Sequence, residues 1–230
     1  MQASTTSTAA AVIVAAGQGR RAGGEIAKQW QEVAGARVID HTLDAFRAHA
    51  RIEDIVLVLH PDASKEHFDG IRSVTGGQTR AASVRAGLAA LEPAAPGLVL
   101  IHDVARPCVP AEIIDAVIDA LAASDGAAPA LPVTDALWHG AEGRVTGLQA
   151  REGLFRAQTP QGFDLTKILA AHASAPADAA DDVAIALAAG LDVAIVPGSE
   201  DNLKITYPPD FARAADILER RHGHQARQRI

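Results

Sequence analysis

The sequence predicts an α/β fold in which a mostly parallel β-sheet is covered by helices on both faces. Three runs of consecutive apolar residues, at 11–15, 55–59 and 98–101, are typical of strands that are buried on both sides. Between and after these runs, apolar residues recur every three or four positions, which predicts amphipathic helices. Strands that alternate with helices in this way form right-handed crossovers, so we expect a doubly wound, Rossmann-like sheet.

The other elements follow along the chain from the same patterns. Ile39, Leu43 and Phe46 share one face of the first predicted helix. We expect helices near 39–46, 84–91 and 113–121, further strands at 192–196 and 203–205, and a closing helix at 210–221.

The segment 133–158 interrupts this alternation. It is polar, contains four glycines and has short alternating stretches, which predict a β-hairpin rather than a crossover helix. An excursion of this size is often functional or an oligomer contact, although an ordinary surface loop fits the sequence equally well. We therefore expect a single domain over residues 1–230, with a β-arm at about 133–158.

The composition limits the classes of function. Of the 230 residues, 48% are hydrophobic and 21% are charged, which is ordinary for a folded globular protein. Only 3% are aromatic, too few for platforms that stack single-stranded nucleic acid, and the net charge of −7 gives no general attraction for polyanions. Nucleic acid is therefore not an expected partner, and any phosphate must be bound by a local cluster of cations.

The single cysteine and the N-terminal segment bear on location. Cys108 cannot form an internal disulfide or a cysteine metal site, which suits a reducing cytoplasm. The apolar run at 9–16 is too short to span a bilayer, and no basic residue precedes it as in a signal peptide. We expect a cytoplasmic protein without a membrane partner.

The strongest functional signal directly follows the first predicted strand, where the segment 15–21 reads Ala-Ala-Gly-Gln-Gly-Arg-Arg. Glycines let the backbone approach a ligand, and ligands of open α/β sheets bind at the carboxyl ends of strands. A Walker A loop is absent, but Gly17, Gly19 and Ala22 satisfy a dinucleotide-binding pattern. The acidic partner of that pattern would fall at Asp40, inside a predicted helix, which weakens this interpretation.

The cations of this loop favour a nucleoside triphosphate instead. Arg20, Arg21 and Lys28 lie close together in the sequence, and such a cluster is costly unless an anion lies between the side chains. Cations around a transferring phosphoryl or nucleotidyl group stabilise the charge of its transition state. A solvated basic loop is the alternative.

Two further clusters lie next to predicted elements. Gly77, Arg80 and Ser83 lie where a helix is predicted to begin, which indicates either a pocket for a base or ribose, or simply a turn with a helix cap. Asp103 and Arg106 follow the third predicted strand. Asp103 can ligate Mg²⁺ or hold a hydroxyl, and Arg106 can hold a phosphate or lock Asp103 in place. A purely structural pair is the alternative.

Charged residues of the last third of the chain add to these clusters. Lys204 lies inside the apolar stretch 203–205, where burying a lysine is costly without an anionic partner. We expect its side chain to point to the site, the alternative being an edge strand with the lysine in solvent. Asp181 and Asp182 open a predicted helix, where carboxylates suit the helix dipole; a substrate role is the alternative. The nine histidines show no metal-ligand grouping, so no protein metal site is expected.

Five segments match one known family. They lie at 15–21 with 28–30, at 76–80 with 83–84, and at 102–107, 158–161 and 201–206. In this order they resemble the 2-C-methyl-D-erythritol 4-phosphate cytidylyltransferases of the non-mevalonate isoprenoid pathway, in their alphaproteobacterial form. The segments span nearly the whole chain, and five in the right order are far more specific than any one alone.

The resemblance implies that CTP and 2-C-methyl-D-erythritol 4-phosphate react to give 4-diphosphocytidyl-2-C-methyl-D-erythritol and pyrophosphate, by in-line attack on the CTP α-phosphate. The implied catalytic residues are Arg21, Lys28, Arg151 and Lys204. The implied substrate-binding residues are Ala15, Ala16, Gly17, Gly19, Gly77, Arg80, Ser83, Asp103, Arg106 and Thr206.

The resemblance also implies Mg²⁺ bound mainly through the CTP phosphates, and a homodimer in which the β-arm carries Arg151 into the neighbour's active site. Ala136 and Ala180 depart from the family's usual residues because both lack a hydroxyl, which affects contacts to the methylerythritol phosphate rather than to CTP. The alternatives are a ribitol-5-phosphate cytidylyltransferase, a CTP-binding module without catalysis and, more remotely, an NAD-dependent dehydrogenase.

Overall fold

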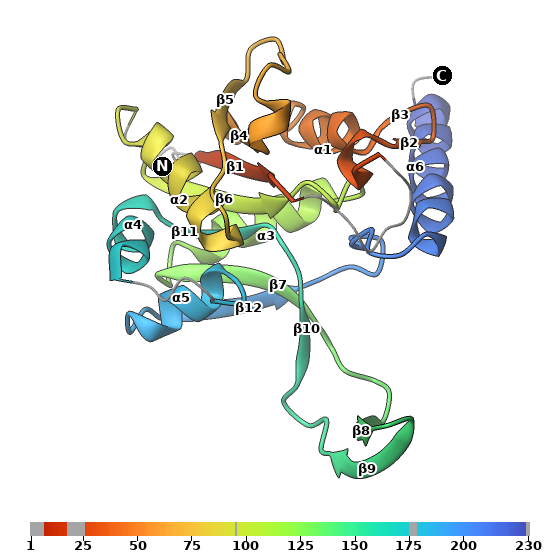
Figure 1. Cartoon of the computed structure of the whole chain (residues 1–230). Coiled ribbons are helices and arrows are strands. Elements are labelled where there is room, and N and C mark those ends of the chain that lie inside the picture. The colour runs from red at the N-terminus through yellow and green to blue at the C-terminus, as the bar shows by residue number, and fades with distance from the viewer. Residues whose placement is uncertain (1–6, 18–25, 95, 175–178, 229–230) are drawn as a thin grey trace.

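A mixed eight-stranded sheet forms the centre of the molecule (Figure 1). The computed structural model describes residues 7–17, 26–94, 96–174 and 179–228. The strands are β1 (Ala9–Ala15), β4 (Ile52–Leu59), β5 (Arg72–Thr75), β6 (Leu98–Asp103), β7 (Gly126–Pro132), β10 (Phe155–Ala157), β11 (Gln161–Asp164) and β12 (Val193–Pro197). Their order is β10-β7-β11-β6-β1-β4-β5, and β12 also pairs with β7.

The parallel pairings are β6 with β1, β1 with β4, β4 with β5, and β7 with β12, whereas β10 and β11 run antiparallel to their neighbours. Helices cover both faces: α1 (Val38–Arg47), α2 (Arg80–Leu91), α3 (Ala111–Ala120), α4 (Leu165–Ser174) and α5 (Asp182–Ala188). The predicted Rossmann-like α/β fold is confirmed.

The central strand β1 shows why the sheet has two apolar cores. Successive side chains of a strand point to opposite faces. Ile13 therefore joins the cluster formed with α1 and α3, while Val12 joins the cluster formed with α2, α4 and α5. Both residues are completely buried, which explains why this strand reads as a continuous apolar run.

A third apolar cluster fixes the C-terminal helix α6 (Pro209–Gln228) to the body. Cys108 is buried in it, and burial raises the pKa of its thiol to about 11. The predicted strand at 203–205 is wrong, because this extended stretch makes a single backbone bond, from Ile205 N to the Ala105 carbonyl (2.8 Å), and no ladder. Helix α6 also continues past 221, where we expected it to end.

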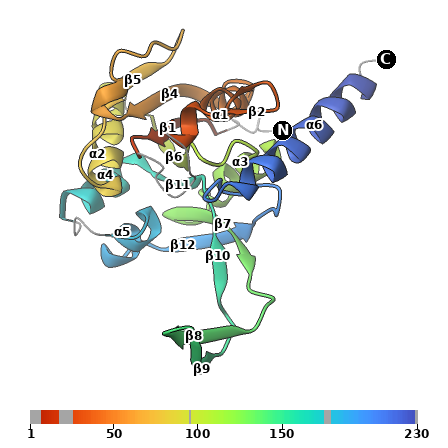
Figure 2. The same cartoon turned by 45° about the vertical axis from the view of Figure 1, so that its right-hand side comes forward.

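The predicted hairpin in 133–158 is confirmed as an arm that projects from the sheet (Figures 1 and 2). Its strands β8 (Leu137–Ala141) and β9 (Arg144–Gln149) are joined by Glu142 and Gly143, which both have positive φ, as a two-residue hairpin turn requires. Large apolar side chains are exposed along the arm, among them Trp138 (65%) and Leu148 (79%). Within the part of the chain that the structure describes, no helix is long and apolar enough to cross a membrane.

Candidate functional site

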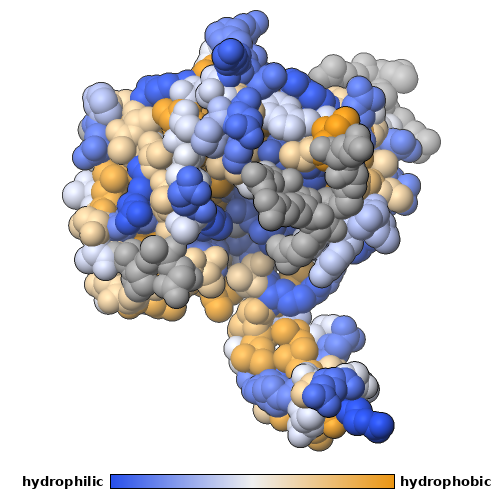
Figure 3. All heavy atoms as spheres, viewed as in Figure 1, coloured by the Kyte–Doolittle hydropathy of each residue, from blue (hydrophilic) through white to orange (hydrophobic). Residues whose placement is uncertain are grey.

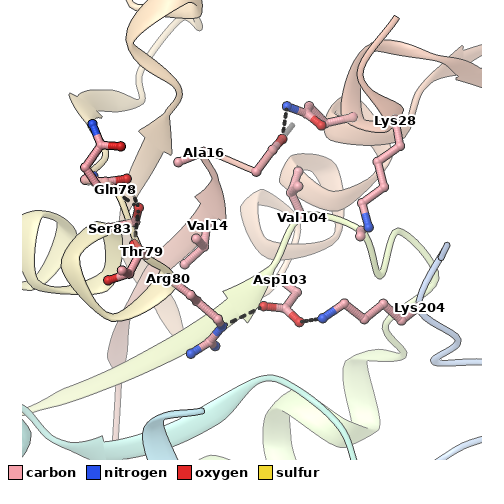
Figure 4. A pocket seen from close by; sticks show the side chains of 14 residues that line it. Val14, Ala16, Lys28, Gln78, Thr79, Arg80, Ser83, Asp103, Val104 and Lys204 are labelled. Carbon is pink, nitrogen blue, oxygen red and sulfur yellow. Dashed lines mark hydrogen bonds and ion pairs between the residues drawn. The ribbon is translucent and has the colours of Figure 1, made fainter. Parts of the chain in front are cut away.

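A cavity of about 240 Å³ opens at the carboxyl ends of β1 and β6. Its walls come from the end of β1, the short turn η2 (Lys28–Trp30), the loop before α2 and the first turn of α2, with Lys204 reaching in from the C-terminal part of the chain (Figure 4). The surface is hollowed above the root of the arm, and hydrophilic residues line the hollow (Figure 3). This is the edge of the sheet at which open α/β proteins bind ligands.

The structure brings together eight of the fourteen residues expected at the site. These residues line the cavity: Ala16, Gly17, Lys28, Gly77, Arg80, Ser83, Asp103 and Lys204. Four others do not line it, namely Ala15, Arg106, Arg151 and Thr206. Gly19 and Arg21 lie outside the described residues.

Gln29 fixes the loop that follows β1, and sequence reasoning missed it. Its side chain is almost completely buried (2% exposed). Its Nε2 atom donates to the carbonyls of Ala15 (3.1 Å) and Gly17 (3.0 Å). The turn that carries Lys28 is thereby tied to the glycine loop, and Ala15 takes part through its carbonyl rather than by lining the cavity. The neighbouring Lys28 ammonium donates to the Ile205 carbonyl (2.8 Å).

The N-terminus of α2 forms another wall of the cavity. Thr79 caps the helix, because its Oγ1 accepts from the N–H of Ala82 (3.1 Å). The Ser83 hydroxyl accepts from the N–H of Gly77 (3.2 Å) and bonds the Thr79 carbonyl (3.0 Å), which folds the loop over the helix. A Cβ at Gly77 would lie 2.5 Å from that of Ala82, so only glycine fits this tight turn. The residues that cap α2 therefore also form this wall of the cavity.

Asp103 lies between two cations in the cavity (Figure 4). Its Oδ1 accepts from Arg80 Nε (3.3 Å), and its Oδ2 accepts from Lys204 Nζ (2.6 Å). Burial by itself raises the pKa of Asp103, but Arg80 and Lys204 outweigh burial and hold this pKa well below its usual range. Asp103 is therefore a carboxylate at any physiological pH. Lys204 points into the site, as expected.

Behind Arg80 lies a second carboxylate, Asp182, which is fully buried. Its Oδ2 accepts from Arg80 Nη1 (2.8 Å), and its Oδ1 is 3.1 Å from His172 Nε2. Burial lowers the pKa of Arg80, yet Asp182 and Asp103 together raise it above its usual value. We expected Asp181 and Asp182 to stabilise the start of a helix. Asp181 does so, because its carboxylate accepts from the N–H of Ala184 (2.9 Å) and caps α5. Sequence reasoning missed the contact of Asp182 with Arg80.

Arg106 makes contacts other than those expected. Its Nη1 donates to the Asn202 carbonyl (2.6 Å) and its Nη2 to the Ala157 carbonyl (3.2 Å), so the guanidinium joins the end of β10 to the segment at Asn202 instead of locking Asp103. The Thr206 hydroxyl donates to the Lys204 carbonyl (3.2 Å), outside the cavity wall.

His102 holds Asp103 in place from inside the sheet. It is completely buried, with Nδ1 3.0 Å from Thr159 Oγ1 and Nε2 3.2 Å from the Arg106 carbonyl. The same threonine hydroxyl accepts from the backbone N–H of Asp103 (3.2 Å). Burial lowers the pKa of His102 to about 4, although the bond to the Arg106 carbonyl opposes this, so the ring is neutral at pH 7.

A glycine-bearing loop and a group of cations around a cavity at the carboxyl ends of parallel strands define a phosphate-binding α/β protein of the nucleotide-binding class. Within that class, the chain belongs to the 2-C-methyl-D-erythritol 4-phosphate cytidylyltransferase family, whose model matches residues 9–220.

Individual relatives agree with this assignment. The 2-C-methyl-D-erythritol 4-phosphate cytidylyltransferase of Cereibacter sphaeroides is 57% identical over 218 residues, which are 92% of this chain and 97% of that protein. A bifunctional IspD/IspF enzyme of Ruegeria pomeroyi is 59% identical over 216 residues, which are 92% of this chain but 57% of that enzyme. This chain therefore matches only part of the bifunctional protein.

Solved structures share the fold. A crystal structure of 4-diphosphocytidyl-2C-methyl-D-erythritol synthase has a TM-score of 0.80 at 29% identity, covering 92% of this chain and 99% of that one. The 2-C-methyl-D-erythritol 4-phosphate cytidylyltransferase from Thermus thermophilus has a TM-score of 0.77 at 34% identity, covering 90% of this chain and 98% of that one.

Proposed function

We propose that this chain is an enzyme that transfers the cytidylyl group of CTP to 2-C-methyl-D-erythritol 4-phosphate and releases pyrophosphate. The observation that carries this proposal is the set of cations at one cavity, in a chain that belongs to the corresponding transferase family. A phosphate oxygen of the acceptor attacks the α-phosphorus in line with the departing pyrophosphate. The attacking group is already an anion, so positioning and charge neutralisation supply the catalysis.

The cations of the cavity divide this work. Lys28 and Arg21 stabilise the charge that develops at the α-phosphate. Lys28 lines the cavity. The role of Arg21 is inferred from the resemblance of its loop to the family. Lys204 positions the attacking phosphate. Its ammonium is paired with Asp103, which holds this cation at the cavity, where an anionic substrate binds.

The small residues between the end of β1 and α2 suit a base and its ribose. Ala16, Gly17, Gly77 and Ser83 all line the cavity. Residues without bulky side chains leave room for a flat ring, and backbone groups supply hydrogen bonds. We assign the cytidine moiety to this end, and the triphosphate to the end at Lys28.

The residues fit a divalent metal that is bound mainly through the nucleotide. No group of three or more His, Cys, Asp or Glu side chains gathers among the described residues, but the cavity offers the single carboxylate of Asp103. Mg²⁺ is often bound by one or two carboxylates together with substrate phosphates, and Asp103 matches that pattern. The bound metal would neutralise phosphate charge.

The arm supports a homodimer as the active form. Arg151 follows β9, is exposed, donates to the Thr134 carbonyl of its own arm, and does not line the cavity of its own chain. Trp138, Val145 and Leu148 expose apolar surface nearby, which is typical of a surface that another protein covers. We infer that this surface binds a second copy, which receives Arg151 at its substrate phosphate.

The alternatives are less well supported. The family and its relatives point to methylerythritol phosphate as the acceptor rather than ribitol phosphate. Ala136 and Ala180, which lack the hydroxyls of the residues usual in the family, do not line the cavity, and we expect them to change acceptor affinity more than nucleotide choice. The lone buried Cys108 suits the cytoplasm, where we place the enzyme.

A pyrophosphate-release assay tests the proposal. We expect release with CTP, Mg²⁺ and 2-C-methyl-D-erythritol 4-phosphate, and much less with ATP, GTP or UTP, or with ribitol 5-phosphate as acceptor. Release with ribitol 5-phosphate alone would move the assignment to the ribitol enzyme. CTP binding without any release, in a folded protein, would leave only a nucleotide-binding module.

A further inference from the structure

Asp182 is a buried carboxylate that the proposed reaction does not use directly. It is fully buried and does not line the cavity. The contacts of its carboxylate within the described structure are Arg80 Nη1 at 2.8 Å and His172 Nε2 at 3.1 Å. A buried carboxylate is costly unless it is paired, so this geometry is held firmly by the surrounding protein.

The position of Asp182 in helix α5 does not explain why it carries a carboxylate. The first N–H groups of the helix are satisfied by other residues, because Asp181 accepts from Ala184 N and Gln161 Oε1 accepts from the N–H groups of Asp182 (3.1 Å) and Val183 (3.2 Å). The Asp182 carboxylate is therefore free to point away from the helix end, toward Arg80.

Arg80 is the link between Asp182 and the cavity. It belongs to the first turn of α2, lines the cavity, and lies across it from Lys28 (Figure 4). One side of its guanidinium contacts Asp182 and the other contacts Asp103, which also holds Lys204. Without Asp182, Arg80 would keep Asp103 as its only carboxylate partner within the described structure, and it would compete with Lys204 for that carboxylate.

We propose that Asp182 is a positioning residue, which fixes Arg80 at the wall of the nucleotide cavity from behind and limits its contact with Asp103 to the single bond from Nε. Asp182 touches no substrate, and its effect passes through Arg80. This inference rests on the proposed transferase function.

Steady-state pyrophosphate release with Asp182→Asn tests the inference. This change removes the charge and keeps the shape. The neutral amide makes a weaker hydrogen bond to Arg80 than the carboxylate does. We therefore expect kcat/KM for CTP to fall on the order of tenfold or more. Most of the loss should lie in KM for CTP, because Arg80 is remote from Lys28. The matched control is Asp181→Asn, which removes the charge of the neighbouring acid, keeps the cap of the same helix because Asn caps as well as Asp, and should leave KM for CTP unchanged.

A double-mutant cycle separates positioning from simple destabilisation. In an Arg80→Gln background, Asp182→Asn should change kcat/KM by less than about twofold, because the two residues act as one unit. Equal effects of Asp182→Asn in both backgrounds would overturn the inference, as would a normal KM for CTP in the single variant. If Asp182→Asn does not fold, Asp182→Glu takes its place: it keeps the charge but displaces Arg80, and an unchanged KM for CTP would again overturn the inference. An inactive wild-type protein would instead reject the proposed function.

Discussion

At the scale of single residues, the cavity is organised around Asp103. Each of its carboxylate oxygens accepts one bond from a cation, Oδ1 from Arg80 and Oδ2 from Lys204, and the Thr159 hydroxyl accepts from its backbone N–H. A fixed anion between two cations keeps them at short range without an external ligand. An incoming triphosphate then meets side chains that are already positioned, which is the arrangement that lowers reorganisation during catalysis.

Lys28 should be essential for turnover and dispensable for folding. We expect Lys28→Ala to lower kcat by roughly two to three orders of magnitude, because a preorganised donor to the transition state is lost. Lys28 is only half-buried at the wall of an open cavity and belongs to no apolar cluster, so thermal unfolding should change little. Lys167→Ala is the matched control, since that lysine pairs with Asp125 at the surface. Near-normal turnover of Lys28→Ala would refute the role given to this lysine.

His102 should make the folded state less stable in mild acid. Its pKa is about 4 in the folded protein, against about 6.5 in an unfolded chain. Between these values the unfolded chain binds a proton that the folded chain does not, so stability falls as the pH decreases from about 6.5 to 4, by up to about 3 kcal/mol. Above this window His102 contributes no pH dependence.

Urea unfolding at several pH values measures this effect. His102→Gln should lose most of the slope below pH 6.5, whereas His139→Gln, on the exposed arm, should retain it. If the unfolding free energy of His102→Gln fell with decreasing pH as steeply as that of the wild type, another group would be responsible for the pH dependence.

Sequence patterns identified Lys28 by its basic, glycine-rich loop, and Asp103 and Lys204 by the apolar residues beside them, because each of these signals lies within one short segment. The same patterns could not identify Gln29 or Asp182. Gln29 reads as an ordinary polar residue, and its partners are carbonyls 12 and 14 positions away. Asp182 meets Arg80 across 102 positions. Only the folding of β1, α2 and α5 around one cavity brings such residues together.

At the scale of elements, the loop before α2 depends on the absence of side chains. Gly77→Ala would place a Cβ 2.5 Å from that of Ala82 and 3.3 Å from its backbone carbon, so the loop must shift. We expect a loss of about 1–3 kcal/mol in unfolding free energy, as for overpacked sites, and weaker CTP binding. Gly97→Ala is the control, because nothing lies within 4 Å of a Cβ there.

Urea unfolding measures the free energy of unfolding, and calorimetric titration measures the affinity for CTP. Unchanged stability and CTP affinity in Gly77→Ala would show that the loop can absorb the methyl group. A loss in Gly97→Ala as large as in Gly77→Ala would show that the effect is not specific to this turn.

The strands that the sequence predicted correctly are those with branched apolar residues, β1, β4, β6 and β12. Strand β7 was not predicted, because its sequence Gly-Ala-Ala-Pro-Ala-Leu-Pro is poor in residues that favour strands. Its pairing with β11, β12 and β10 overrides this weak propensity. The reverse error occurred at 203–205, where alternation suggested a strand but no neighbouring strand forms a ladder with it.

At the scale of the whole molecule, the arm is the feature that a monomer does not explain. It projects from the sheet (Figure 2). Its side chains Trp138, Val145 and Leu148 are exposed. Burying such side chains against a second copy would stabilise the arm and the dimer together. In that arrangement each active site draws Lys28 from one chain and Arg151 from the other.

Mixing two inactive variants tests that arrangement. Lys28→Ala and Arg151→Ala should each be nearly inactive alone. If Arg151 acts on the partner's site, a mixed dimer contains one intact site, and random exchange of equal amounts should restore about a quarter of wild-type activity. If Arg151 serves its own chain, both sites of a mixed dimer lack one of the two residues, so the mixture stays inactive. A third change, Leu148→Asp, serves as the control because it places a charge on the apolar surface of the arm. It should shift sedimentation toward the monomer. When it is added to both the Lys28→Ala and the Arg151→Ala chains, mixing them should no longer restore activity.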